Sequence, residues 1–399
     1  MIINLNMKLK DIKKYKVLCM MHKNQFGNEK KPISAEYNGI YKALKLINKN
    51  TFFLETHDNK KTIYENNLKI ISYIRKIKPE IIFCHQSTYE IYSETYKIIK
   101  KICNPILINW CSDDSWRYDQ HSFLISKNFD YLVTTYNYAH KKNLNNNINS
   151  ILASWGCPDH WVGKKKNKKY KYDVTFIGNP YMGRRNIVKK LKEDGIKINC
   201  FGYGWNSIIK DEQISQIIQT SKINLNFSKS KGFKKQTKAR IFEITGAKGF
   251  CLTEQSNELK KYFKIKKQID VFDSYNELKN KIIYYLENSK KRERIAKAGY
   301  IQCKKNFVYT EVIKKIFKKV KISKKIKENT YKYEKLNKPK KNMILNIYKS
   351  MFTSLLMVFF SKKKSLSISR RILFEIEWRL NKETTYSVKG WCNRLYNFN

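Results

Sequence analysis

Short apolar runs alternate with amphipathic stretches through the first part of the chain. Apolar runs typical of buried strands cover 15–21, 51–55, 80–85, 105–110 and 131–135. Between them, apolar residues at helical spacing predict helices over 34–48, 63–77 and 89–102. Buried strands that alternate with helices indicate a parallel sheet covered on both faces. Ligands bind beyond the carboxyl ends of the strands in such sheets, so we expect the chemistry in the loops that follow the strands.

The same alternation begins again after a lysine-rich stretch without apolar periodicity. The strands expected there cover 172–178, 196–201, 221–228, 249–253 and 268–272. The expected helices cover 186–193, 240 to Gly246 or Gly249, 275–287, 291–306 and 310–324. The chain therefore predicts an α/β protein with two Rossmann-like domains facing each other across a cleft, where small ligands commonly bind.

These patterns divide the chain into four parts. We expect an N-terminal domain (1–162), a basic linker (163–171), a C-terminal domain (172–320) and a basic, amphipathic helical tail (321–399).

The composition indicates a folded protein with an anionic partner. Its 42% hydrophobic and 14% aromatic residues exclude an intrinsically disordered chain. Its 82 Lys and Arg against 33 Asp and Glu give a formal charge of +49, typical of contact with nucleic acid, an acidic membrane face or phosphorylated substrates. Because the chain is also rich in Asn and Ile, a compositional bias spread over the surface explains the charge equally well.

The cysteines indicate a reducing compartment. The nine are scattered without a Cys-x-x-Cys pair or clustered histidines, so they predict no zinc site. Most stand in apolar runs, as buried thiols do. The N-terminus also lacks the sustained apolar core of a signal peptide. We expect a cytoplasmic protein.

The tail combines charge with one apolar segment. Residues 343–360 are strongly apolar but contain Asn346 and Lys349, so they do not match the roughly 20 apolar residues of a spanning helix. Basic residues flank the segment, which predicts an interfacial helix on an anionic membrane surface through 321–371, at the inner face of the membrane. Packing on the protein's own surface or on a partner subunit is the alternative.

An acidic loop follows the fourth predicted strand. It is Asn109-Trp-Cys-Ser-Asp-Asp-Ser-Trp-Arg-Tyr-Asp119, with the adjacent carboxylates Asp113 and Asp114 between two tryptophans. Apolar neighbours and a second carboxylate raise the pKa of an acid, which suits a general base acting on an acceptor hydroxyl. Alternatively, these acids cap the following turn, and Asp119 pairs with Arg117.

Two histidines stand at strand ends in the same part of the chain. His85 ends the run 80–85 and is a further candidate base, and His22 has the same standing after the first strand. A single histidine is more often a structural residue than a catalytic one.

Two loops of the second alternating part suit a nucleotide. Gly178 and Gly183 permit close backbone approach, and Arg184 and Arg185 at a helix start suit a pyrophosphate. The loop is neither the Gly-x-Gly-x-x-Gly fingerprint nor a P-loop. The turn from Gly202 to Trp205 adds aromatic rings that can stack on a base.

The helix that begins near Arg240 carries Glu243 close to its start. The free N–H groups and dipole of its first turn favour phosphate, and the carboxylate can accept hydrogen bonds from ribose hydroxyls. An ordinary surface helix with a charged face is the alternative.

Seven short motifs in this order resemble one known family, over about residues 172–317. They are Asp173-Val-Thr-Phe-Ile-Gly178, Gly183-Arg-Arg185, Phe201-Gly-Tyr-Gly-Trp205, Ser221-Lys-Ile-Asn-Leu-Asn226, Ala239-Arg-Ile-Phe-Glu-Ile244, Gly249-Phe-Cys-Leu-Thr253 and Ile295-Ala-Lys-Ala-Gly299. The family is the glycosyl transferase-like domain of the spore-protein CgeB/YkvP type, among glycosyltransferases with the GT-B fold. The acidic loop and Phe129–Thr135 also resemble the N-terminal halves of such proteins.

The resemblance implies a glycosyltransferase of the EC 2.4 class that moves a sugar from a nucleotide sugar to an acceptor hydroxyl, in cell-surface or envelope glycan synthesis. It implies that the N-terminal domain (1–162) is the acceptor side and that the C-terminal domain (172–320) binds the nucleotide sugar. It also implies that Glu243 holds the donor ribose, that Arg240 and the Gly183-Arg184-Arg185 loop neutralise the diphosphate, and that Gly202 to Trp205 lie near the base. It also implies no bound metal and no cofactor. The glutamate-rich donor pattern of many retaining members is not evident upstream of Glu243, where the loop is rich in lysine.

Two other function classes remain open from the sequence. The charge and the many Tyr and Phe suit a basic nucleic-acid-binding protein, but no known binding motif is present and the charge is spread along the chain. The other class is a catalytically inactive GT-B-like assembly module. The favoured partners are a nucleotide-sugar donor and a glycan or lipid-linked acceptor.

Overall fold

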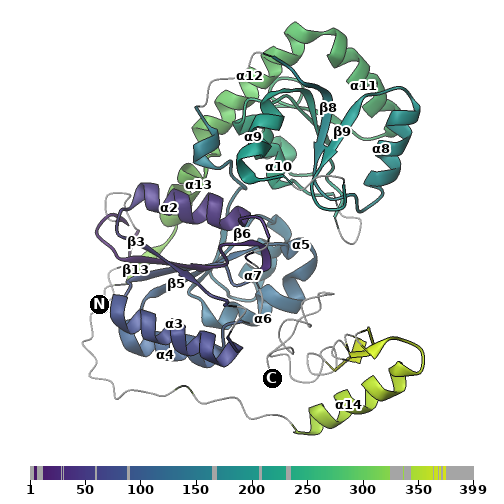
Figure 1. Ribbon diagram of the computed structural model, residues 1–399. Coiled ribbons are helices and arrows are strands. Elements are labelled where there is room, and N and C mark those ends of the chain that lie inside the picture. Colours follow the sequence, from purple (N-terminus) through teal and green to yellow (C-terminus); the bar gives the residue numbers. More distant parts are fainter. Residues whose placement is uncertain are drawn as a thin grey trace. The chain divides into compact units, whose positions relative to one another are not determined.

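The protein consists of two compact units, each built on a parallel sheet (Figure 1). One unit comprises Met1–Tyr37, Leu44–Ala153 and Ile316–Asn399, and the other comprises Asn38–Ala43 and Ser154–Lys315. The computed structural model describes residues 4–6, 12–27, 29, 31–58, 61–87, 90–163, 169–205, 209–230, 235–323, 336, 343–362, 364–366, 368–369 and 372–373. Parts of the predicted linker, of the lysine-rich loop before Gln236 and of the tail lie outside these residues.

The first unit contains a six-stranded parallel sheet in the order β3-β2-β4-β5-β6-β7. Its strands are β2 (Val17–Met21), β3 (Thr51–Glu55), β4 (Ile81–Cys84), β5 (Ile106–Cys111), β6 (Tyr131–Thr134) and β7 (Ser150–Leu152). The strands β2 and β4 are buried along their whole length, which explains why they are continuous apolar runs.

Helices connect these strands. They are a π-helical turn at Tyr37–Tyr41 that continues into α2 (Lys42–Ile47), α3 (Ile63–Ile77), α4 (Ser93–Cys103), α5 (Asp114–Arg117), α6 (Phe123–Ile125) and α7 (Asn137–Asn145). A capping box fixes the start of α3, where Thr62 accepts from the backbone of Glu65 and the Glu65 carboxylate accepts from the backbone of Thr62. Lys78 in the left-handed region ends the helix.

The second unit contains a five-stranded parallel sheet in the order β12-β11-β10-β8-β9. Its strands are β8 (Tyr172–Ile177), β9 (Ile198–Phe201), β10 (Ser221–Asn226), β11 (Cys251–Glu254) and β12 (Asp270–Phe272). Its helices are α8 (Arg184–Glu193), α9 (Asp211–Gln219), α10 (Ala239–Gly246), α11 (Tyr275–Glu287) and α12 (Ser289–Asn306), followed by α13 (Tyr309–Phe317), which runs into the first unit.

Both sheets are wound in the same sequence. In each, the second strand of the unit lies outside the first, and the later strands extend from the other side of the first. The order reverses between β2 and β4 in one sheet and between β8 and β10 in the other. Ligands of doubly wound sheets bind outside the carboxyl ends of the strands at this switch point. The predicted α/β fold with two Rossmann-like sheets is thus confirmed.

The end of the predicted helix over 310–324 is wrong. The helix α13 ends at Phe317, the chain turns, and β13 (Lys321–Ser323) pairs antiparallel with β1 (Asn4–Asn6). The partner strand lies more than 300 residues away in the sequence, so no local pattern could reveal the pairing. In the tail, α14 (Met343–Met357) occupies most of the predicted apolar helix.

Candidate functional site

Two buried histidines flank the switch point of the first sheet. His22 follows β2 and His85 follows β4, and both side chains are more than nine-tenths buried. The Nε2 atom of His22 lies 3.2 Å from a carboxylate oxygen of the buried Glu90, and its Nδ1 atom lies 3.7 Å from Glu55 at the end of β3. Burial raises the pKa of Glu55, whereas the nearby His22 lowers it. His22 is therefore held between two carboxylates.

His85 belongs to a neighbouring polar group. Its Nε2 atom lies 2.7 Å from Oγ of Ser112, which donates a hydrogen bond of 3.2 Å to Glu36. The same Nε2 atom lies 3.7 Å from the Glu36 carboxylate. Burial lowers the pKa of His85, and Glu36 only partly opposes that effect, so the imidazole is neutral at physiological pH. Its Nε2 atom is already engaged with Ser112.

The structure gives the acids of the predicted catalytic loop different environments. Asp114 is buried, accepts a hydrogen bond from Ser122, and has its pKa raised to about 6 by burial. Asp113 is exposed and lies before α5 with a φ of 60°, which is costly for a residue other than glycine. Its carboxylate makes no capping hydrogen bond, and none of the described residues pairs with it.

The predicted alternative roles of this loop are only partly right. Asp119 pairs with Lys142 at 2.8 Å and not with Arg117. The buried Arg117 instead donates to the carbonyl oxygen of Ser87, across the loop that follows His85. Of the four candidate bases, Asp113 is the only one that is exposed, and His22, His85 and Asp114 are buried.

In the second sheet, two glycine loops meet beside the switch point. Gly202 has a φ of +118°, and a Cβ atom there would lie 3.1 Å from the carbonyl oxygen of Gly178. The indole N–H of Trp205 donates to that same oxygen at 2.7 Å. The ring of Trp205 packs edge-on against Phe176. Trp205 therefore holds the loops after β8 and β9 together, a structural role beside its predicted place near the base.

The two arginines after β8 differ in how many hydrogen bonds their guanidinium groups donate to backbone carbonyls. Arg184 is half-buried and donates to the carbonyl oxygens of Asn179 (3.2 Å) and Lys229 (2.9 Å). Burial lowers its pKa. Arg185 is exposed, lies over the Trp205 ring and donates to one carbonyl, that of Gly204, at 2.9 Å. Gly183, at the N-cap of α8, has open space around its Cα atom.

The start of α10 brings Arg240 and Glu243 together. Arg240 forms an ion pair of 2.6 Å with Oε2 of Glu243, and both side chains are mostly buried. Burial raises the pKa of Glu243, Arg240 lowers it, and Asp211 at the start of α9 raises it further. Asp211 itself pairs with His160 at 3.0 Å. Among the described residues, Oε1 of Glu243 has no hydrogen-bond partner.

A further carboxylate holds the lysine-rich loop. Oε2 of the buried Glu254 accepts hydrogen bonds from the backbone N–H groups of Ser228 (2.9 Å) and Lys229 (3.2 Å). The ammonium groups of Lys229 and Lys235 lie 3.9 and 3.8 Å from its Oε1 atom. The sequence left Glu254 without a role, although its place at the end of a predicted strand was a usable signal.

The described part of the chain was searched for metal-binding clusters and for membrane-spanning helices. In that part, no group of three or more His, Cys, Asp or Glu side chains is arranged to hold a metal ion. None of the helices in the described ranges is both long and apolar enough to cross a bilayer.

One protein family has a model that matches most of the second unit. Residues 184–318 match the model of a family described as glycosyl transferase-like. This part of the chain is therefore similar to that family. It contains Arg184, Arg185, Arg240, Glu243 and the whole lysine-rich loop, while Gly178 and Gly183 precede it. No curated protein sequence matches the chain.

Solved structures with a similar fold are glycosyltransferases or bind nucleotide sugar. A glycosyltransferase from Rickettsia africae ESF-5 has a TM-score of 0.50 and 12% identity, over 76% of this chain and 98% of that chain. HepE of Anabaena with UDP and glucose has a TM-score of 0.53 and 9% identity, over 76% and 98%. Its complex with UDP-glucose has a TM-score of 0.50 and 9% identity, over 75% and 98%. At these identities the likeness shows the fold, which is that of GT-B glycosyltransferases.

Proposed function

We propose that the protein is a glycosyltransferase of the EC 2.4 class that moves a sugar from a nucleotide-sugar donor to an acceptor hydroxyl. The observation that carries the proposal is that the glycosyl transferase-like match covers four of the five strands of the second parallel sheet, in which the loops after β8 and β9 combine glycines with positive φ and basic side chains. Such a strand-end site offers backbone N–H groups and positive charge to a diphosphate. The ordered motifs further support the CgeB/YkvP type within this class.

On the donor side, Glu243 has one carboxylate oxygen for the ribose. Its Oε2 atom is paired with Arg240, and Oε1 is available to accept from the ribose hydroxyls. Arg185 is the better of the two loop arginines for the diphosphate, because Arg184 is used on two backbone carbonyls. One structure of HepE contains UDP-glucose, which makes that nucleotide sugar the first donor to test.

On the acceptor side, Asp113 is the proposed base. Its carboxylate is exposed and lies just beyond the carboxyl end of β5. The acceptor oxygen forms a bond to the anomeric carbon as the bond from that carbon to the donor phosphate oxygen breaks. Asp113 takes the proton of the acceptor hydroxyl, and the diphosphate leaves with the electron pair, stabilised by basic residues and backbone N–H groups. The protein's own residues supply each of these roles without a resident metal.

The tail supports a membrane-associated acceptor. The large apolar residues at the end of α14 and just beyond it are exposed, Val358 by 77% and Phe359 by 80%, and Lys362 and Lys364 follow them. Exposed apolar residues beside lysines fit the interface of an anionic bilayer. We therefore propose a peripheral enzyme of cell-surface or envelope glycan synthesis on the cytoplasmic face. Co-sedimentation with anionic but not neutral vesicles checks this, and equal recovery in the supernatant with both contradicts it.

A thermal-shift screen tests the proposed activity. Ligands that bind the native state raise its stability, so one of UDP-, GDP-, CMP- or dTDP-sugars should raise the melting temperature. The wild-type protein is compared with Glu243→Gln and with Glu311→Gln, which breaks a matched Glu–Lys pair of 2.6 Å on α13. A shift in wild type and Glu311→Gln that shrinks in Glu243→Gln supports the donor site. No shift with any nucleotide sugar overturns the proposal.

A further inference from the structure

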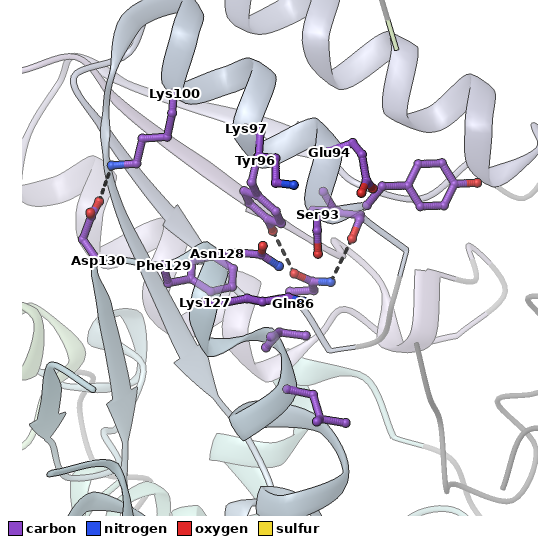
Figure 2. Close-up of a pocket in the computed structure, with 14 residues that line it drawn as sticks. Gln86, Ser93, Glu94, Tyr96, Lys97, Lys100, Lys127, Asn128, Phe129 and Asp130 are labelled. Atoms are coloured by element: carbon purple, nitrogen blue, oxygen red, sulfur yellow. Dashed lines mark hydrogen bonds and ion pairs between the residues drawn. The ribbon is translucent and has the colours of Figure 1, made fainter. Parts of the chain in front are cut away.

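A groove in the first unit is lined by none of the candidate catalytic or donor-binding residues described above. It has a volume of about 470 Å³ and runs between α4 and the segment from Leu124 to Asp130 (Figure 2). This volume is within the range of small-ligand sites, roughly 300–1,000 Å³. All of its lining residues belong to one unit, so its shape does not depend on the position of the other unit.

One end of the groove is formed by Gln86, the residue that follows the candidate base His85 in the sequence. Gln86 directly follows His85 at the end of β4, and its backbone N–H donates to Oδ1 of Asn109 at 2.9 Å. The buried Gln86 side chain accepts from the hydroxyl of Tyr96 at 2.9 Å, as Figure 2 shows. It also donates to the carbonyl oxygen of Ile91 at 3.3 Å. This end of the groove is therefore fixed before a ligand arrives.

The opposite end is fixed by an ion pair. Lys100 of α4 lies 2.6 Å from Asp130 (Figure 2). It also donates to the carbonyl oxygen of Pro105 at 2.7 Å. The same carboxylate oxygen of Asp130 accepts from the backbone N–H of Leu107 at 2.7 Å. The lysine charge is thus balanced within the protein, so this end offers a rigid polar wall and not a free cation.

Between these ends, ring faces and polar groups share the lining. The rings of Tyr96 and Phe129 meet edge to face with centroids 4.9 Å apart. Asn128 is half-buried beside them, and its amide has no hydrogen-bond partner among the described residues. Ser93 and Lys97 add a hydroxyl and an ammonium group from α4. The groove therefore offers donors and acceptors next to apolar surface.

The charge of the lining narrows the class of ligand. Three lysines face two acids, Glu94 and Asp130, whereas the whole chain has 82 basic against 33 acidic residues. A groove of nearly balanced charge does not select a phosphate or a nucleic acid, for which the rest of this surface is better suited. A saccharide matches it, because a sugar ring presents hydroxyls at its edge and C–H groups on its face.

We propose that this groove binds a saccharide unit of the acceptor, at a distance from the hydroxyl that is glycosylated. The proposal rests on the proposed function for the identity of the acceptor, but the binding itself can be measured without sugar transfer. It assigns Asn128 and Lys97 to hydrogen bonds with sugar hydroxyls, and Phe129 to contact with a ring face. Acceptors of several sugar units would then bind better than single sugars.

Saturation-transfer NMR on the full chain tests the groove with a panel of neutral di- to hexasaccharides. Wild-type protein should transfer magnetisation to at least one longer member. Asn128→Ala and Lys97→Ala, a change at an exposed residue, should each raise the Kd of that oligosaccharide about three- to tenfold, as expected for a lost hydrogen bond. Asn145→Ala, an exposed asparagine of α7 in the same unit, should leave it unchanged.

The outcomes separate this proposal from the proposed function. If oligosaccharides bind and both groove variants weaken them, the groove is supported, even if no nucleotide sugar binds. If no oligosaccharide binds, or if the groove variants bind as wild type does, the groove is overturned, whatever the donor experiments show. Because Lys97 is exposed, we expect Lys97→Ala to fold. The test therefore remains valid should Asn128→Ala fail to fold.

Discussion

The two parallel sheets share one winding order but carry opposite chemistry at their switch points. In the first sheet, His22 and His85 are buried and each is placed beside a carboxylate. In the second, the loops after β8 and β9 contain glycines with positive φ, and the exposed Arg185 follows the first of these loops. One strand-end framework therefore supports a closed polar network in one unit and an open, basic, backbone-rich surface in the other.

The difference follows from what each surface must satisfy. Buried imidazoles and carboxylates are stable only when they are paired, so the network of the first sheet draws partners from distant segments such as Glu36 and Glu90. An anion site instead needs unsatisfied N–H groups and close backbone approach, which glycine supplies. We therefore expect acceptor chemistry to be sensitive to single acids in the first unit, and donor binding to depend on loop shape in the second.

The largest expected effect is at Asp113. Asp113→Asn removes the proposed base, so sugar transfer should fall about 10²- to 10⁴-fold while nucleotide-sugar binding is unchanged. Asp119→Asn, an exposed acid of the same loop region, is the control and should stay within about twofold of wild type. Initial rates of transfer and donor Kd values measure both. Equal rates in the two variants would mean that Asp113 is not the base.

The next effect is the pH dependence caused by Asp114. Its pKa is about 6 in the folded protein against 3.8 ordinarily, so the native state binds more protons between these values. The contribution of Asp114 to wild-type stability should therefore fall as pH rises from about 4 to about 6, on the order of 3 kcal/mol in total. Asp114→Asn lacks this group, so its stability relative to wild type should rise over the same window. Urea unfolding at several pH values measures the difference, and a constant difference refutes the assignment.

A smaller effect is expected at the glycine contact of the second sheet. Gly202→Ala combines a strained φ with a Cβ atom 3.1 Å from the Gly178 oxygen, whereas Gly195→Ala has a φ of +82° and open space. The strain costs roughly 1–3 kcal/mol at each position, so only Gly202→Ala should also displace the loop after β8. We expect it to melt lower than Gly195→Ala and to bind nucleotide sugar more weakly. Equal donor affinity in both variants would show that the shape of the loop after β8 does not affect donor binding.

The smallest expected effect is that of a chelator. Because basic residues and backbone N–H groups are proposed to stabilise the leaving diphosphate, EDTA should leave the transfer rate within about twofold. A loss of transfer that Mg²⁺ or Mn²⁺ restores would show that a metal shares this role.

The fold was predictable where the signal is local. The helices at 63–77 and 275–287 have the predicted ends, because their caps and apolar faces are encoded within a few turns. Elsewhere the observed first residues of strands and helices differ from the predicted ones by a few positions. The helix α4, for example, begins at Ser93, whereas the prediction began at Tyr89. The strand β13 could not be predicted, since its partner is the N-terminal β1.

The site was predictable as a set of positions but not as a set of contacts. The sequence placed Asp113 and His85 at the ends of strands, where the structure also has them. It placed Glu243 close to the start of a helix, and the structure has it within α10. It could not show that Ser112 and Glu36 engage His85, because those three residues come from segments 27 and 76 residues apart. Burial, which separates Asp114 from Asp113, is likewise a property of the packed chain.

Titration calorimetry with the nucleotide sugar that gives the largest thermal shift tests the central claim most directly. The account predicts that Glu243→Gln binds it about tenfold or more weakly than wild type, because a hydrogen bond to a charged carboxylate is lost. Glu311→Gln should bind as wild type does. Equal affinity of wild type and Glu243→Gln would contradict the donor site at the second sheet.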